Sequence, residues 1–203
     1  MFDGDVQFVP LLAQDYWSVP LNSIFVPSTT GGSGTTLTPT QEESSAIIDS
    51  GSTIITGPQR LVDAFYAAVD GAVQGETISP ELQGQWFVPC GTTVNAKFTF
   101  GNVTVTLTAD QLHQPQDQSP NIPSYSQPLC LGSLTSTPGE ATYPAWIMGD
   151  SLMKSVRTMS LILFFKKDPM AYPFSYLDLL RVPSWNCYDN RQCRAIRRCG
   201  TST

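Results

Sequence analysis

One carboxylate, Asp49, lies in the segment SSAIIDSGSTIITGP at residues 44–58, where small residues could orient it for chemistry. Four such residues, three with hydroxyls, follow it directly: Ser50, Gly51, Ser52 and Thr53. An aspartate beside a tight turn is most often a local acceptor for backbone N–H groups. The apolar flanks favour a second interpretation, in which the turn is buried, the carboxylate pKa is raised, and the hydroxyls hold the carboxylate for catalysis.

Composition predicts the kind of framework that must position this carboxylate. The chain has 203 residues, of which 14% are charged, and it contains 15 Gly and 16 Pro. Few charges and many turn-forming residues are typical of a β-rich globular protein. No run of 18 apolar residues occurs, so we expect no membrane span. The N-terminal residues 1–12 are acidic and lack a long apolar core, so we expect no signal peptide there.

The net charge of −6 is unevenly distributed along the chain. Residues 1–158 carry 14 acidic and 4 basic residues, whereas residues 159–203 carry 3 acidic and 7 basic residues. Nucleic-acid binding depends on clustered cations that contact phosphates. The acidic body therefore argues against a nucleic-acid partner.

Alternating apolar and polar residues predict the first elements. Residues 5–26 are expected to form two strands, broken near residues 10–14. Residues 27–45 are rich in Gly, Ser and Thr, which indicates a long polar loop or a loosely paired hairpin. A flexible linker is the open alternative for the same stretch.

The centre of the chain combines a strand, a turn and a helix. AIIDS (46–50) reads as a buried strand that STIITGP (52–58) continues past the turn. Residues 58–72 are the best helix, beginning at Pro58 and stopping at Gly71. Its apolar residues recur at helical spacing: Leu61, Val62, Phe65, Tyr66 and Val69.

Short strands are predicted over 86–90, 96–112 and 128–134, and a strand leading into a short helix over 145–158. We therefore predict a mainly β fold with one or two short helices.

Residues 159–203 lose the alternating pattern and end in a C-x5-C-x5-C spacing at Cys187, Cys193 and Cys199. That spacing is typical neither of zinc sites nor of redox motifs. A metal or disulfide microdomain remains the open alternative to a divergent tail.

Other chemistries have weak support in the sequence. His113, the only histidine, lies in a polar loop, and no G-x-S-x-G elbow is present for a serine hydrolase. Signatures for phosphate loops and dinucleotides are missing, and we expect no metal and no cofactor. Asn102-Val103-Thr104 is a possible N-glycosylation sequon, which has meaning only in the secretory pathway.

The segment AIIDSGSTIITGP (46–58) resembles the second active-site segment of the pepsin-like aspartic proteases. Further ordered matches follow that family's C-terminal lobe, with the appearance of its fungal members. They are FDGDVQFVPLLAQDYWSVPLNSI (2–24), RLVDAFYAAVDGA (60–72), VPCGTTVNAKFTFGNVTVTL (88–107), PLCLGSL (128–134) and AWIMGDSLMKSVRT (145–158). The resemblance implies a single pepsin-like β-lobe over residues 1–158, followed by a divergent, poorly ordered tail over 159–203.

The resemblance also implies a role for each residue around the carboxylate. Asp49 would be a catalytic aspartate, Gly51 would let the backbone approach it, and Ser52 would hydrogen-bond its outer oxygen. Ser50 stands where the family usually has Thr and keeps the hydroxyl, while Thr53 would face the substrate cleft. Two further sets complete the pattern: Ile147, Met148 and Gly149 as the supporting loop, and Cys90 with Cys130 as the disulfide of the lobe.

The family's mechanism requires two aspartates, and this chain contains one D-[ST]-G with apolar flanks. The expected activity is aspartic endopeptidase action on peptide or protein substrates, in an extracellular or secretory location. An N-terminal protease lobe or a second copy of the chain would supply the other carboxylate. The alternative is a catalytically inactive fragment or binding remnant, such as a truncated or mis-spliced product.

Overall fold

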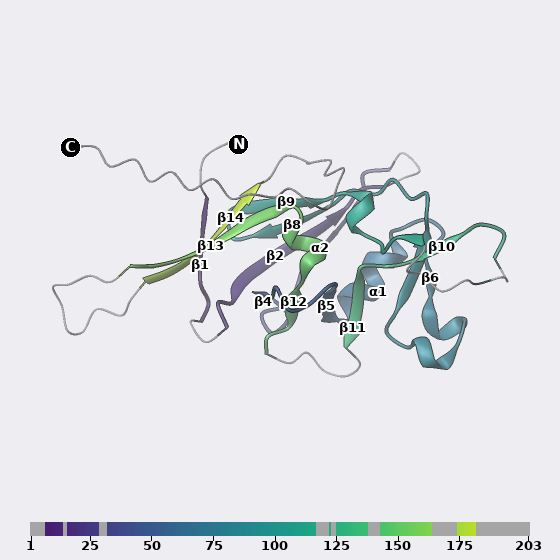
Figure 1. The fold of residues 1–203 in the computed structure, drawn as a ribbon, viewed down its shortest axis with the longest axis horizontal. Helices are drawn as coiled ribbons and strands as arrows, with labels where there is room; N and C mark the ends of the chain where they lie inside the picture. The colour runs from purple at the N-terminus through teal and green to yellow at the C-terminus, as the bar shows by residue number, and fades with distance from the viewer. Residues whose placement is uncertain are drawn as a thin grey trace, which may run out of the picture.

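A computed structural model describes residues 7–13, 16–28, 32–116, 122, 125–137, 143–163 and 174–181 (Figure 1). Strands predominate in these residues, with two short α-helices, α1 (Gln59–Ala67) and α2 (Asp150–Met153). The predicted mainly β class with one or two short helices is therefore confirmed. No helix in the described ranges is long and apolar enough to cross a bilayer.

The largest sheet places the candidate carboxylate at its centre. Its strands run in the order β11-β5-β12-β4-β2-β8-β9, and β3 pairs with β2 beside this path. Their bounds are β2 (Val19–Val26), β3 (Thr35–Leu37), β4 (Ser45–Ile48), β5 (Ile55–Pro58), β8 (Ala96–Phe100), β9 (Val103–Leu107), β11 (Leu134–Thr137) and β12 (Trp146–Met148). Strand β12 pairs parallel with β4 and antiparallel with β5, so it separates the two strands that flank Asp49.

Two three-stranded sheets lie at opposite ends of the view in Figure 1. One contains β1 (Phe8–Pro10), β14 (Phe174–Arg181) and β13 (Val156–Leu163). The other contains β6 (Val73–Gln74), β7 (Trp86–Pro89) and β10 (Leu129–Leu131). Three 3-10 turns complete the described elements: η1 (Gly75–Thr77), η2 (Pro80–Leu82) and η3 (Ala109–Gln111).

Strand β13 continues past residue 158, and β14 pairs with it inside the stretch that we predicted to be a divergent tail. The remaining tail residues, with Cys187, Cys193 and Cys199, lie outside the described residues. The division at residue 158 and the character of the tail stay predictions.

The polar stretch at residues 27–45 contains a paired strand. Strand β3 forms an antiparallel pair with β2, in which Ile24 lies opposite Leu37. Both of these side chains are buried, so their packing sets the register of the hairpin. The described residues of this stretch therefore contain a short hairpin strand, as the prediction of a loosely paired hairpin requires, and they are not a flexible linker throughout.

Helix α1 is shorter than the predicted residues 58–72. Pro58 belongs to β5 and occupies the N-cap position, and the helix ends before Ala68. The N–H groups of Ala68 and Val69 bond to carbonyls three residues earlier, which tightens the last turn. Gly71 then takes a φ of +74°, in the left-handed region that favours glycine. The buried face is as predicted, with Leu61, Val62, Phe65 and Tyr66 in the core.

Candidate functional site

Asp49 immediately follows β4, in the loop that leads to β5. Its backbone N–H donates to the carbonyl of Met148 at 3.0 Å, which extends the parallel pairing of β4 and β12 by one residue. Met148 is fully buried and Ile147 is half-buried. Met148, one of the residues predicted to support the carboxylate loop, is thus hydrogen-bonded to Asp49.

Both oxygens of the Asp49 carboxylate are held by the residues that follow it. Ser52 Oγ donates to Oδ2 at 2.6 Å, and the Gly51 N–H donates to Oδ1 at 2.9 Å. A Cβ at Gly51 would lie 3.2 Å from Oδ1, so glycine gives the backbone close access. The contact between Ser52 and Asp49 is the one that the family pattern implies.

These donors lower the pKa of Asp49 below its usual value, first through the Ser52 hydroxyl and then through the Gly51 N–H. The expectation of a raised pKa was therefore wrong for this chain. Hydrogen bonds to a carboxylate stabilise its charged form, and burial opposes them only weakly here.

The expectation of a buried turn was also wrong. Ser50, Gly51 and Thr53 are exposed, and Asp49 is half-buried. On the apolar flanks, Ala46 and Ile55 are fully buried, whereas Ile47 and Ile48 are half-buried. The burial of residues in the two strands therefore does not extend to the turn between them.

A second loop locks the backbone of the first. The N–H groups of Asp150 and Ser151 donate to the carbonyls of Ser52 and Thr53 at 2.8 and 3.1 Å. Ser151 Oγ also donates to the Thr53 carbonyl at 3.1 Å. A Cβ at Gly149 would collide with the carbonyls of Ser52 and Ile54, so only glycine permits this approach.

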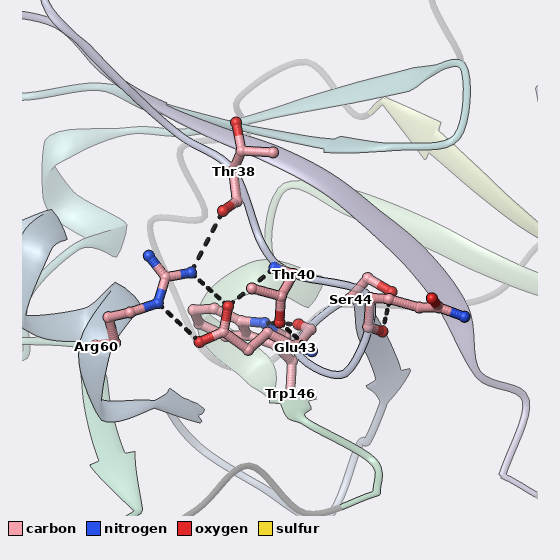
Figure 2. Close-up of polar contacts among 7 residues, drawn as sticks. Thr38, Thr40, Glu43, Ser44, Arg60 and Trp146 are labelled. Atoms are coloured by element: carbon pink, nitrogen blue, oxygen red, sulfur yellow. Dashed lines mark hydrogen bonds and ion pairs between the residues drawn. The ribbon is translucent and has the colours of Figure 1, made fainter.

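A polar cluster that sequence reasoning missed lies at the start of β4 (Figure 2). The Glu43 carboxylate accepts hydrogen bonds from Arg60 Nε at 3.0 Å, from Arg60 Nη2, and from the Thr40 N–H at 2.9 Å. Glu43 is buried, and its pKa is lowered to about 2, chiefly by the hydrogen bonds from Arg60. Arg60 Nη2 also donates to the Thr38 carbonyl at 3.4 Å.

This cluster connects β4, β5 and β12, the three strands around the carboxylate loop. The Trp146 indole N–H, from β12, donates to the Glu43 carbonyl at 2.8 Å. The Trp146 ring covers Gly57 of β5 so closely that a Cβ there would collide with it. One sequence signal could have revealed the ion pair. Arg60 lies in the first turn of a helix, where the helix dipole disfavours a cation that has no acidic partner.

The predicted disulfide is confirmed between Cys90 and Cys130, whose Cα atoms are 5.0 Å apart. It joins the end of β7 to β10, next to the antiparallel pair of Val88 with Cys130. The cross-link lies in a three-stranded sheet separate from the strands that carry Asp49.

The remaining candidate residues, His113 and Asn102, lie outside the strands that flank Asp49. His113 is half-buried, forms a backbone bridge with Gly132, and its Nδ1 contacts the Gln114 carbonyl at 2.9 Å. Asn102 lies in the turn between β8 and β9. Within the described ranges, no three His, Cys, Asp or Glu residues are grouped so that they could hold a metal ion.

Comparison with known proteins gives a consistent match. A model described as "Eukaryotic aspartyl protease" matches residues 1–160. Major aspartyl peptidase 1 of Cryptococcus neoformans var. grubii is 25% identical over 189 residues, which cover 87% of this chain and 34% of that protein. Cathepsin D of Clupea harengus is 29% identical over 154 residues (73% and 34%), and napsin-A of Mus musculus is 31% identical over 147 residues (70% and 30%).

The chain spans about a third of the length of the curated relatives it matches. These relatives come from Cryptococcus, Clupea and Mus, so a fungal-type character stays a prediction. The assignment to the C-terminal lobe is compatible with the matches and also stays a prediction.

Proposed function

Because the chain belongs to the eukaryotic aspartyl protease family, we propose that Asp49 is one of two carboxylates that activate water to hydrolyse peptide bonds. The observation that carries this proposal is the way the carboxylate is held. Ser52 and Gly51 each donate to a different oxygen, and the loop that bears them is locked by Gly149 and Ser151. An ordinary surface aspartate needs no such second loop.

The proposed mechanism uses one ionised and one protonated carboxylate. The ionised member takes a proton from water as the water attacks the substrate carbonyl, and the protonated member donates a proton to the carbonyl oxygen. The hydrogen bonds to Asp49 favour its ionised form. A second carboxylate brought beside it would hold a proton, because two adjacent negative charges raise the pKa of one of them.

The second carboxylate is proposed to come from an N-terminal protease lobe or from a second copy of this chain. Two observations support a partner. The turn that carries Asp49 is exposed along Ser50, Gly51 and Thr53. Among the described residues, the Asp49 carboxylate is hydrogen-bonded to the Ser52 hydroxyl and the Gly51 N–H, and to no second carboxyl group. Thr53 is proposed to face the peptide substrate, since it is exposed on the same turn.

We also propose an extracellular or secretory location. The bond between Cys90 and Cys130 supports it, because disulfides form and persist mainly in oxidising compartments.

A second candidate function is a catalytically inactive remnant that keeps the lobe and binds peptides or another protease lobe. The presence of one D-[ST]-G segment with apolar flanks favours this candidate for the chain on its own. A mechanism that shares a proton between two carboxylates loses its proton donor when one of them is absent.

Activity assays can separate these candidates. The purified chain is incubated with an unfolded protein substrate at acid pH, alone over a range of concentrations and together with an N-terminal aspartic-protease lobe. Asp49→Asn serves as the matched variant, because the amide keeps the shape but loses the negative charge. Pepstatin is added to a parallel set.

Under the proposal, pepstatin-sensitive cleavage depends on Asp49 and appears with the added lobe. If the chain instead pairs with itself, the rate of cleavage by the chain alone rises with the square of the chain concentration. Cleavage that survives Asp49→Asn would overturn the catalytic assignment. No cleavage under any of these conditions would support the inactive remnant.

A further inference from the structure

The turn between β8 and β9 is a two-residue hairpin loop. Phe100 pairs with Val103, which leaves Gly101 and Asn102 as the loop. Gly101 has a φ of +56°, whereas Asn102 does not have a positive φ. This combination matches a type II′ turn, in which only the first central residue needs a positive φ. Asn102 is thus the second central residue of the turn, and its backbone conformation does not require an asparagine.

The asparagines that the structure describes differ in what their side chains do. Asn22 Oδ1 accepts a hydrogen bond from the Gly101 N–H, and Asn95 Oδ1 accepts one from the Ala109 N–H at 2.9 Å. Each of these two holds a neighbouring turn in place. The Asn102 residue is exposed, and its side chain makes no hydrogen bond to any residue in the described ranges. The fold leaves this amide free.

The strand after the turn presents the rest of the sequon to solvent. Val103 is buried and Thr104 is exposed, as expected for a strand whose side chains alternate between two faces. Asn102, in the turn, and Thr104, in the strand, are both exposed. Of the six asparagines in the chain, Asn102 alone has Ser or Thr two positions later.

We propose that Asn102 is a site of N-linked glycosylation. The inference is independent of the proposed protease function and rests on the free amide, the outward Thr104 and the disulfide Cys90–Cys130, which points to an oxidising compartment. In the transfer, the Asn102 amide nitrogen bonds to the anomeric carbon of a lipid-pyrophosphate-linked oligosaccharide. The bond from that carbon to the pyrophosphate breaks, and the amide loses one proton as the lipid pyrophosphate leaves.

A glycan at this position would also protect an edge of the main sheet. Strand β9 is the last strand in the sheet order, and β8 is its neighbour on one side. Unpaired strand edges are templates for association with other chains, and bulky or charged groups on them block it. Ser155 Oγ donates to the Thr106 carbonyl near the far end of β9, whereas Asn102 lies at the near end. The glycan would thus cover the part of the edge that Ser155 does not reach.

The test expresses the full chain with a secretion leader in a eukaryotic cell and recovers it from the medium and from the secretory membranes. Treatment with a peptide N-glycosidase is expected to increase the electrophoretic mobility and to convert Asn102 to Asp, which peptide mass spectrometry detects. Two variants separate the modification from the fold. Thr104→Val and Thr99→Val both remove the contact between the Thr99 and Thr104 hydroxyls, which are 3.1 Å apart, but only Thr104→Val destroys the sequon.

The proposal predicts that wild type, Thr99→Val and Thr104→Ser are modified, and that Thr104→Val and Asn102→Gln are not. The unmodified variants should also form more soluble aggregates in size-exclusion chromatography than Thr99→Val does. An unmodified Asn102 in wild-type chain recovered from the secretory membranes or medium would overturn the proposal. A mobility shift that persists in Thr104→Val would overturn it as well.

Discussion

Glu43 and Arg60 form a two-point contact, in which Arg60 Nε and Nη2 each donate to a separate oxygen of the Glu43 carboxylate. Glu43 lies just before β4, and Arg60 lies in the first turn of α1. The contact therefore spans the whole segment that carries Asp49. With the Trp146 indole on the Glu43 carbonyl, it fixes the spacing of the strands on both sides of the carboxylate loop.

Replacing Glu43 with Gln is expected to lower the free energy of unfolding at pH 7 by about 1–2 kcal/mol. The figure is below that for a fully buried ion pair because the Arg60 side chain is 57% exposed to solvent. Chemical denaturation measures the change. Glu42→Gln is the matched control, since Glu42 is exposed. The decrease in the free energy of unfolding caused by Glu42→Gln should be within the error of the measurement. Equal losses in the two variants would contradict the assigned role of the pair.

The contribution of Glu43 to stability should depend on pH in the acid range. Its pKa is lowered from 4.5 to about 2 in the folded protein, so the unfolded chain binds the proton first as pH falls. The stability that this carboxylate contributes is therefore fully present above about pH 4.5 and is lost as pH falls toward 2. Denaturation curves at several pH values should show that the difference in the free energy of unfolding between wild type and Glu43→Gln becomes smaller over that window. If this difference in free energy stays constant down to pH 2, the pKa of Glu43 is not lowered in the folded protein.

Removing the Ser52 hydroxyl should raise the pKa of Asp49, because the hydrogen bond from Ser52 is the largest influence that lowers it. Titration of the Asp49 carboxyl carbon by NMR measures this in Ser52→Ala. Ser50→Ala is the control, since Ser50 also bears a hydroxyl beside Asp49 but is exposed and makes no described contact with the carboxylate. A pKa that is unchanged in Ser52→Ala, or raised equally in both variants, would rule out the proposed orientation.

Gly149→Ala is expected to destabilise the fold by about 1–3 kcal/mol, because its Cβ would overlap the carbonyls of Ser52 and Ile54. Those backbone atoms cannot move without disturbing the carboxylate loop. Gly91→Ala is the matched control, since a Cβ there meets nothing within 4 Å. Thermal unfolding of the two variants should therefore differ clearly. Similar melting temperatures would mean that the two loops are less closely packed than described.

The local pattern around Asp49 was sufficient to predict its position after a strand, because a short apolar run with β-branched residues, bounded by turn residues, indicates a strand. The predicted burial holds for Ala46, whereas Ile47 and Ile48 are half-buried. The exposure of Ser50 and Thr53 was not predictable in the same way. Whether a turn is covered depends on elements distant in sequence that pack on it. The same is true of the Glu43–Arg60 pair, whose partners are 17 residues apart and on different elements. The helix face at Leu61 and Phe65 followed from periodicity, whereas the helix end depended on the turn at Gly71.

The insertion of β12 between β4 and β5 has a consequence for how the protein folds. The contacts that fix the carboxylate loop join residues about a hundred positions apart, such as Ser151 with Thr53 and Trp146 with Glu43. Contacts of such long range form slowly, because a long chain segment must close before they can be made. During synthesis, Asp49 emerges well before the strand that shapes its loop. The nascent chain therefore carries the complete D-S-G-S motif without the geometry, and the site is assembled only when residues 146–151 arrive.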